Sequence, residues 1–147
     1  MVVLAFLSLA MANSASADKK TENDTAAVKE KAATVTNVDN EKLKELIDNN
    51  VLVVDIRREE EWRDTGIIKG SKTITFFNRN GSVNKDFLSK FTAVAKKDQP
   101  VVLICRTGVR TSHATKAIAQ QLGYKNVINV TDGIMGWIGE KKPVTKY

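Results

Sequence analysis

The stretch Pro100–Gly123, PVVLICRTGVRTSHATKAIAQQLG, decides the fold of this chain. It begins with a short apolar run rich in β-branched residues, which is typical of a buried strand in a parallel sheet. The only cysteine of the chain, Cys105, stands at the end of that run. A helical pattern follows, with Gly123 as its C-terminal stop. The stretch therefore predicts a strand, a loop and a helix, the repeating unit of an α/β protein.

The rest of the chain continues this alternation. Apolar runs predict further strands at residues 51–56, 72–77 and 126–130. Helical apolar spacing predicts helices at residues 38–50, 58–65, 83–97, 111–123 and 133–140. A length of 147 residues suggests one domain, and no internal repeat is visible. We therefore predict an α/β sandwich with a mainly parallel sheet.

The loop CRTGVR after the central strand is the main candidate for a functional site. Ligands of parallel α/β sheets gather at the carboxyl ends of the strands. Gly108 allows a tight turn that brings backbone N–H groups inward, and the N-terminus of the following helix adds to them. Such a cradle, with Arg106 and Arg110 beside it, would stabilise a thiolate on Cys105. The alternative is that Cys105 simply packs as a small buried residue, which its place at a strand end disfavours.

The spacing within the loop separates two thiolate chemistries. Cysteine phosphatases place five residues between the cysteine and the arginine, and their loop wraps a tetrahedral phosphate. Here only four residues separate Cys105 from Arg110. A shorter loop is better matched to a single sulfur carried on the cysteine, so the spacing favours sulfur transfer.

Three sequence blocks together resemble the single-domain rhodanese (thiosulfate sulfurtransferase-like) family. They are the early block VVDIRREEEWRDTGIIKGS, the loop CRTGVRT and the closing block GYKNVINVTDGIMGWIGEKKPV, in the family's order. The resemblance covers about residues 38–144. Three positions depart from the family's usual His, Gly and Gly, namely Ile67, Asp132 and Lys141.

The resemblance implies both a fold and a reaction. The fold is a rhodanese-like three-layer sandwich, with a five-stranded, mainly parallel sheet flanked by helices. In the reaction Cys105 takes a sulfane sulfur from a donor such as thiosulfate and passes it, as a persulfide, to cyanide or a thiol acceptor. The implied substrate-binding loop comprises Arg106, Thr107, Gly108, Val109, Arg110 and Thr111. The resemblance implies no metal and no organic cofactor.

Two other functions stay open. The first is a cysteine phosphatase or arsenate reductase on the same fold, which the loop length disfavours. The second is a persulfide carrier or partner-binding module with little turnover. Assaying a phosphate ester beside thiosulfate separates the first from a sulfurtransferase, and comparing turnover with stable persulfide loading separates the second.

The charge of the chain bears on its partners. Lys and Arg number 23 and Asp and Glu 17, a net charge of +6. Positive and negative residues balance at 14 each through Ala95, whereas from Lys96 onward there are 9 and 3. The excess around Cys105 favours small anions or acidic partners, although solvated lysines would explain part of it equally well. We expect a small anionic sulfur donor, a small or protein thiophilic acceptor, no nucleic acid and a monomer.

The first 17 residues carry no charge and end in Ala15-Ser16-Ala17. We interpret residues 1–17 as a secretory signal peptide, residues 18–33 as a flexible polar leader and residues 34–147 as the rhodanese-like domain. The apolar core of the signal is too short to span a bilayer. A buried helix is the alternative, because the usual basic start is missing. We therefore expect export to the periplasm, or secretion where the organism lacks an outer membrane, with no membrane attachment after cleavage.

For several other polar residues the sequence favours a structural role over a catalytic one. His113 is the only histidine, and its place in the predicted helix favours a surface or packing role over that of a base. Asp55 and Arg57 end the first buried strand, and we predict that they pair and brace the loop. The acidic run 59–61 stands at a predicted helix start, where negative charge suits the dipole and needs no functional account.

Overall fold

The computed structural model describes residues 32–147. Five parallel strands form one sheet in the order β1-β5-β4-β2-β3. The strands are β1 (Thr34–Val38), β2 (Leu52–Asp55), β3 (Lys72–Thr73), β4 (Pro100–Ile104) and β5 (Asn126–Val130). The helices are α1 (Asn40–Asp48), α2 (Glu59–Thr65), α3 (Phe87–Val94), α4 (Val109–Leu122) and α5 (Gly133–Gly139). This α/β architecture confirms the predicted fold class.

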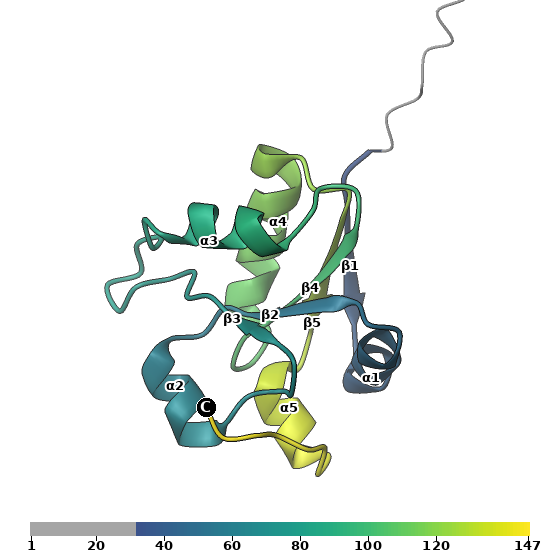
Figure 1. Cartoon of the computed structure of the whole chain (residues 1–147), viewed down its shortest axis with the longest axis vertical. Coiled ribbons are helices and arrows are strands. Elements are labelled where there is room, and N and C mark those ends of the chain that lie inside the picture. The colour runs from purple at the N-terminus through teal and green to yellow at the C-terminus, as the bar shows by residue number, and fades with distance from the viewer. Residues whose placement is uncertain (1–31) are drawn as a thin grey trace, which may run out of the picture.

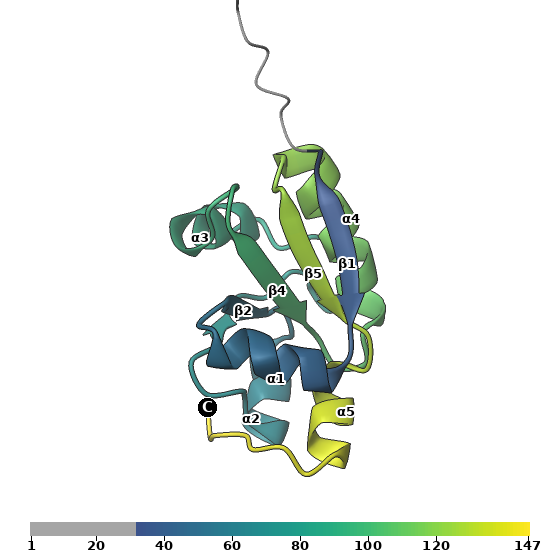
Figure 2. The same cartoon turned by 90° about the vertical axis from the view of Figure 1, so that its right-hand side faces the viewer.

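The helices cover both faces of the sheet, so the molecule has three layers (Figures 1 and 2). Alternate residues of a strand point to opposite faces. On β4, Val101 and Leu103 pack toward α3 and α4, whereas Val102 and Ile104 pack toward α1 and α5. Each face therefore has its own apolar cluster. The buried strands read as continuous apolar runs because both of their faces are covered.

Three elements differ from the sequence prediction. Strand β1 was not predicted, because it is an edge strand with four exposed residues and its sequence, TVTNV, has no buried apolar run. The predicted strand 72–77 pairs in the sheet only at its first two residues. The predicted helix 83–97 forms only at Phe87–Val94, since Val83 instead bridges to Phe77 in a small hairpin.

The predictions about the N-terminus fall outside this description. The predicted signal peptide, residues 1–17, is not among the described residues, nor are all but the last two residues of the predicted leader 18–33. Between residues 32 and 147, no helix has the length and apolar character needed to cross a membrane.

Candidate active site

Cys105 follows β4 directly and lies at the bottom of a short loop that leads into α4. Its side chain is fully buried and forms no disulfide. The amide of Gly108 donates to Cys105 Sγ at 3.2 Å, and Thr111 Oγ1 lies 3.5 Å from the same sulfur. The cysteine is therefore buried, as the packing alternative required, yet its sulfur faces the polar start of a helix. That is the environment predicted for a thiolate.

The N-terminus of α5 holds the first half of the loop through the backbone. The amide of Ile134 donates to the carbonyl of Cys105 at 2.8 Å, and that of Met135 donates to the carbonyl of Arg106 at 3.1 Å. Within residues 32–147 no backbone carbonyl accepts from the amides of Arg106 and Thr107. The first amides of α4 also have no partner inside their helix. Amides thus remain free along the loop, as an anion-binding cradle requires.

Two glycines allow the loop to pack this closely. Gly108 has a φ of +85°, and a Cβ atom there would lie 2.0 Å from the carbonyl oxygen of Thr131. Gly133, at the start of α5, has a φ of +58°, and a Cβ atom there would lie 2.4 Å from the carbonyl oxygen of Arg106. Any side chain at either position would push the loop away from the turn after β5.

The two arginines of the loop have different surroundings. Arg110 Nη1 and Nη2 donate to the two carboxylate oxygens of Glu61 at 2.8 and 2.6 Å. Arg106 is exposed and, within the described part of the chain, forms no ion pair. Arg110 is therefore compensated by a carboxylate, whereas Arg106 presents an open positive charge at the loop.

Glu61 is nearly buried, with 8% of its surface exposed. Burial raises the pKa of Glu61, but hydrogen bonds from Arg110 and from the backbone of Arg58, together with the positive charge of both residues, bring that pKa below its ordinary value. The hydrogen bonds that Arg110 donates to Glu61 in turn raise the pKa of Arg110. The two groups thus stay ionised as a bidentate pair.

The role of Glu61 was not predicted from the sequence, because the acidic run 59–61 as a whole fits the start of a helix. Only Glu61 of that run is buried. Its carboxylate also accepts from the amide of Arg58 at 3.1 Å, which fixes it at the N-terminus of α2. A signal was present in the sequence, since Glu61 lies within the early block VVDIRREEEWRDTGIIKGS that resembles the rhodanese family.

The predicted pairing of Asp55 with Arg57 is confirmed. Arg57 donates to both carboxylate oxygens of Asp55, at 2.9 and 2.7 Å, and both side chains are fully buried. The same guanidinium donates to Thr65 Oγ1 at 2.7 Å and to the carbonyl of Gly66 at 2.9 Å. Arg57 therefore ties the end of β2 to the far end of α2. Because α2 carries Glu61, this network braces the loop indirectly.

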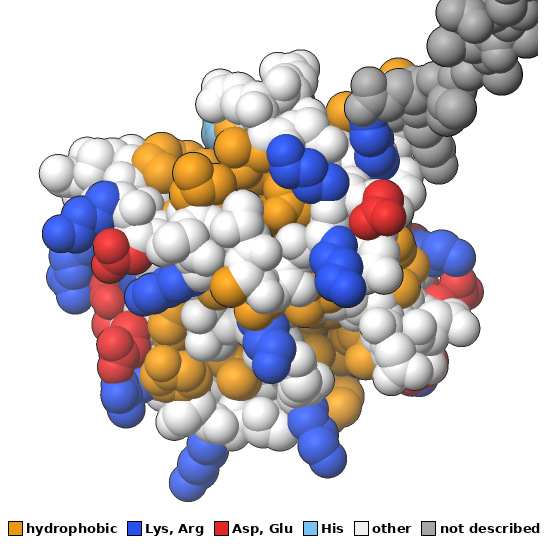
Figure 3. Space-filling model, turned by 45° about the horizontal axis from the view of Figure 1, so that its top comes forward, with side chains coloured by type: hydrophobic (Ala, Val, Ile, Leu, Met, Phe, Trp, Pro, Cys, Tyr) orange, Lys and Arg blue, Asp and Glu red, His pale blue; other side chains and the backbone are white. Residues whose placement is uncertain are grey.

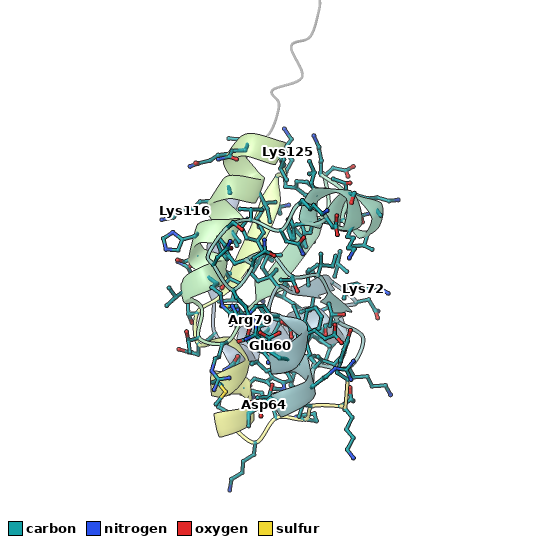
Figure 4. All side chains as sticks on the ribbon, turned by 90° about the vertical axis from the view of Figure 1, so that its left-hand side faces the viewer. Glu60, Asp64, Lys72, Arg79, Lys116 and Lys125 are labelled. Atoms are coloured by element: carbon teal, nitrogen blue, oxygen red, sulfur yellow. The ribbon has the colours of Figure 1, made fainter. Side chains whose placement is uncertain are left out.

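A hairpin at residues 77–83 is tied to the same helix. Arg79 Nη2 lies 3.1 Å from Glu60 Oε1, and Figure 4 shows the two side chains together beside α2. Both side chains are substantially exposed, so the pair contributes little stability by itself. It places the hairpin beside α2, the helix that carries Glu61.

The remaining predicted site residues take separate places. Thr107 and Val109 are exposed at the mouth of the loop, and Thr111 is buried and donates to the carbonyl of Gly108 at 3.0 Å. His113 is exposed on α4, which agrees with the predicted surface role. In the described range 32–147, no group of three His, Cys, Asp or Glu residues is arranged to hold a metal ion.

The comparison with protein families decides the identity of the domain. The model described as "Rhodanese-like domain" matches residues 39–140, which include the Cys105 loop, Glu61 and the buried pair behind it. The chain belongs to the rhodanese-like family.

Similar proteins agree with this rhodanese-like assignment. "Putative sulfurtransferase YtwF" of Bacillus subtilis is 35% identical over 103 residues, covering 69% of this chain and 88% of that protein. "Uncharacterized protein RP600" of Rickettsia prowazekii is 34% identical over 95 residues, covering 62% of this chain and 75% of the relative. The crystal structure of Rv0390 from M. tuberculosis has a TM-score of 0.65 at 22% identity, with 79% of this rhodanese-like chain and 100% of that chain covered. That last likeness shows the shared fold.

Proposed function

We propose that this rhodanese-like protein is a sulfurtransferase that carries sulfur on Cys105. The observation that carries the proposal is the position of the sole thiol. Cys105 Sγ accepts a hydrogen bond from an amide at the helix start and lies at the base of a loop whose other amides have no backbone partner within residues 32–147. Such a site stabilises one negatively charged sulfur atom and needs no metal to do so.

The proposed reaction has two steps. The thiolate of Cys105 first attacks the outer sulfur of a donor such as thiosulfate. The sulfur–sulfur bond of the donor breaks, and sulfite leaves with the electron pair. In the second step cyanide or an acceptor thiolate attacks the outer sulfur of the Cys105 persulfide, and Cys105 leaves as a thiolate. Each step is one displacement at sulfur, so the reaction balances without a further oxidant or reductant.

The two arginines would divide the work of binding an anionic donor. Arg106, exposed and unpaired in the described structure, would attract the dianion and favour the departure of sulfite. Arg110 would act mainly through its shape, because its charge is already compensated by Glu61 at 2.6 Å. The second half of the loop is thereby held in place for the amides to act.

A thiocyanate assay with thiosulfate and cyanide tests the activity. Wild-type protein should form thiocyanate, and Cys105→Ser should form none above the uncatalysed rate. A phosphate ester assayed in parallel should not be hydrolysed. Hydrolysis of the ester without thiocyanate formation would instead support the phosphatase alternative. Stable persulfide loading with negligible thiocyanate formation would support a carrier.

We also propose that the protein is exported, because residues 1–17 carry no charge and end in Ala15-Ser16-Ala17. N-terminal sequencing of the protein purified from its native source should then begin at Asp18. A native chain that still begins at Met1 would contradict export through a cleaved signal peptide.

A further inference from the structure

An apolar groove of about 470 Å³ lies between α3, α4 and the 77–83 hairpin. Six of the residues that line it are Phe76, Phe77, Val83, Leu88, Ala117 and Leu122. The side chains of Val83 and Leu88 are 55% and 50% exposed. Figure 3 shows hydrophobic side chains gathered on the upper surface of the molecule, where these elements lie. Exposed apolar surface of this kind marks an interaction site more often than chance packing does.

One face of α4 runs from the groove toward the loop that holds Cys105. Val109, His113, Ala117 and Gln121 stand four residues apart on α4 and therefore share one face of that helix. The last three line the groove, and Val109, which is 63% exposed, belongs to the loop. This face extends about 18 Å, at 1.5 Å per residue. A segment lying in the groove would thus have one end at the mouth of the active site.

The charge around the groove is positive. Lys85 lines its wall, and among the described residues no Asp or Glu does so. Asp86 is next to Lys85 in the chain but does not line the groove. Lys116 is exposed on α4 (Figure 4) and precedes the lining residue Ala117 in the chain, and Arg106 is open at the loop. The complementary ligand therefore combines apolar side chains with negative charge.

We propose that the groove binds an acidic segment of a sulfur-acceptor protein, one that carries apolar side chains and a cysteine. The inference rests on the proposed function and names the class of acceptor for it. An open groove with half-exposed branched side chains suits a polypeptide better than a small enclosed ligand does. The cysteine of the segment would reach the loop while its apolar residues occupy the space between Leu88 and Ala117.

Two other occupants fit the charge less well. A second copy of this chain, packed through a two-fold interface, would place the same positively charged face, with Lys85 and Lys116, on both sides of the contact. Residues 18–33 of the chain itself carry four positive and four negative side chains and only one large apolar residue, Val28. Neither supplies the acidic and apolar surface that complements the groove.

Sulfur transfer to the acceptor is a single displacement at sulfur. The thiolate of the acceptor cysteine attacks the outer sulfur of the Cys105 persulfide. A new sulfur–sulfur bond forms on the acceptor, the bond to Cys105 breaks, and Cys105 leaves as a thiolate. The proton of the outer sulfur stays with that sulfur. The acceptor is left with a persulfide, and the protein is ready for another donor.

Synthetic peptides serve as probes for the groove. One peptide carries leucines at i, i+3, i+4 and i+7, glutamates at the other positions and a terminal cysteine. A second peptide replaces every glutamate by lysine, glutathione is the small acceptor, and each peptide is made with the cysteine at either end. Persulfide-loaded protein is mixed with each acceptor, and the rate of sulfur transfer is followed by mass spectrometry. The acidic peptide should accept sulfur at least about tenfold faster than glutathione and the lysine peptide.

Paired variants distinguish binding in the groove from a general effect of charge on the transfer rate. Leu88→Asp should lower the rate with the acidic peptide roughly tenfold, because a buried leucine contact is lost. Its control is Val94→Asp on the same helix, which is exposed but does not line the groove. Lys85→Glu should reduce the preference for the acidic peptide, whereas Lys90→Glu, on α3 and not in the groove lining, should not. Turnover with cyanide should be the same in all four variants.

The outcomes distinguish this inference from the proposed function. Failure of thiosulfate to load Cys105 would contradict the proposed function; loading by inorganic polysulfide would still allow the groove to be tested. Equal rates for the acidic peptide and glutathione, or equal effects of Leu88→Asp and Val94→Asp, would overturn the inference. A wild-type dimer that Leu88→Asp converts to a monomer in gel filtration would also overturn it, in favour of a second copy.

Discussion

The two halves of the Cys105 loop are held by different kinds of interaction. In the first half, Ile134 and Met135 donate backbone hydrogen bonds to the loop, and Gly108 sits against the backbone of Thr131. In the second half, one side-chain pair, Arg110 with Glu61, joins α4 to α2. The first half is thus fixed by contacts that only glycine permits, and the second by an ion pair that substitution and pH can weaken.

The largest loss of stability is expected at Gly108, where the neighbouring backbone leaves no room for a side chain. Gly108→Ala should destabilise the protein by about 4 kcal/mol or more and abolish sulfur loading, because its Cβ would lie 2.0 Å from Thr131 O. Gly70→Ala is the matched control, since Gly70 has a φ of +84° but no atom within 4 Å of a Cβ. It should cost only about 1 kcal/mol, from backbone strain alone. Equal losses for the two variants in chemical denaturation would refute the close approach.

Substitution in the second half of the loop, which the Arg110–Glu61 pair holds, should cost less stability. Glu61→Gln leaves Arg110 without its carboxylate and should cost about 2–3 kcal/mol, because both side chains are largely buried. Glu59→Gln removes an exposed partner of Arg63 on the same helix and should cost less than about 0.5 kcal/mol. A double-mutant cycle with Arg110→Met tests whether the loss belongs to the pair. A cycle that shows no coupling would mean that Glu61 acts only as a helix cap.

The pH dependence should distinguish the two halves. Because the pKa of Glu61 is lowered by folding, its contribution is complete above the ordinary value of 4.5 and declines as pH falls through the lowered pKa. The stability difference between wild type and Glu61→Gln should therefore be constant between pH 7 and 5 and shrink in more acid solution. The cost of Gly108→Ala should change little over the same range. A wild-type advantage over Glu61→Gln that grows below pH 4 would contradict the assigned sign.

The smallest effect on stability is expected at Arg106, which is exposed. Arg106→Gln should change the free energy of unfolding by less than about 0.5 kcal/mol. The KM for thiosulfate should rise roughly tenfold and lose much of its dependence on ionic strength, since the open cation is gone. Steady-state kinetics at low and high salt would measure this. An unchanged KM would show that the donor is attracted by other groups.

The sequence predicted the first half of the loop better than the second. The strand end, Cys105 and Gly108 lie within a few residues of each other in the chain, so local patterns are enough to place them together. Arg110 and Glu61 are 49 residues apart, and only the folded chain shows that they meet. Both arginines therefore looked alike in the sequence, although one is paired and the other is open.

The same reason explains the elements that were missed. Strand β1 is stabilised by pairing with β5 at the sheet edge, and its exposed residues carry no apolar signal. Residues 83–86 fit a helical pattern, yet Val83 pairs with Phe77 in a hairpin, and the helix begins only at Phe87. In contrast, the central strands and α4 were correctly predicted, because burial on both sides imposes a clear apolar pattern.

The most direct test of the account is intact-protein mass spectrometry before and after thiosulfate, with Cys105→Ser as the control. If Cys105 carries sulfur, wild type alone should gain about one sulfur, and cyanide should remove it again. A wild-type protein with a free, reduced thiol that gains no sulfur would contradict the account. The amide-lined loop at the end of β4 would then need a different anion.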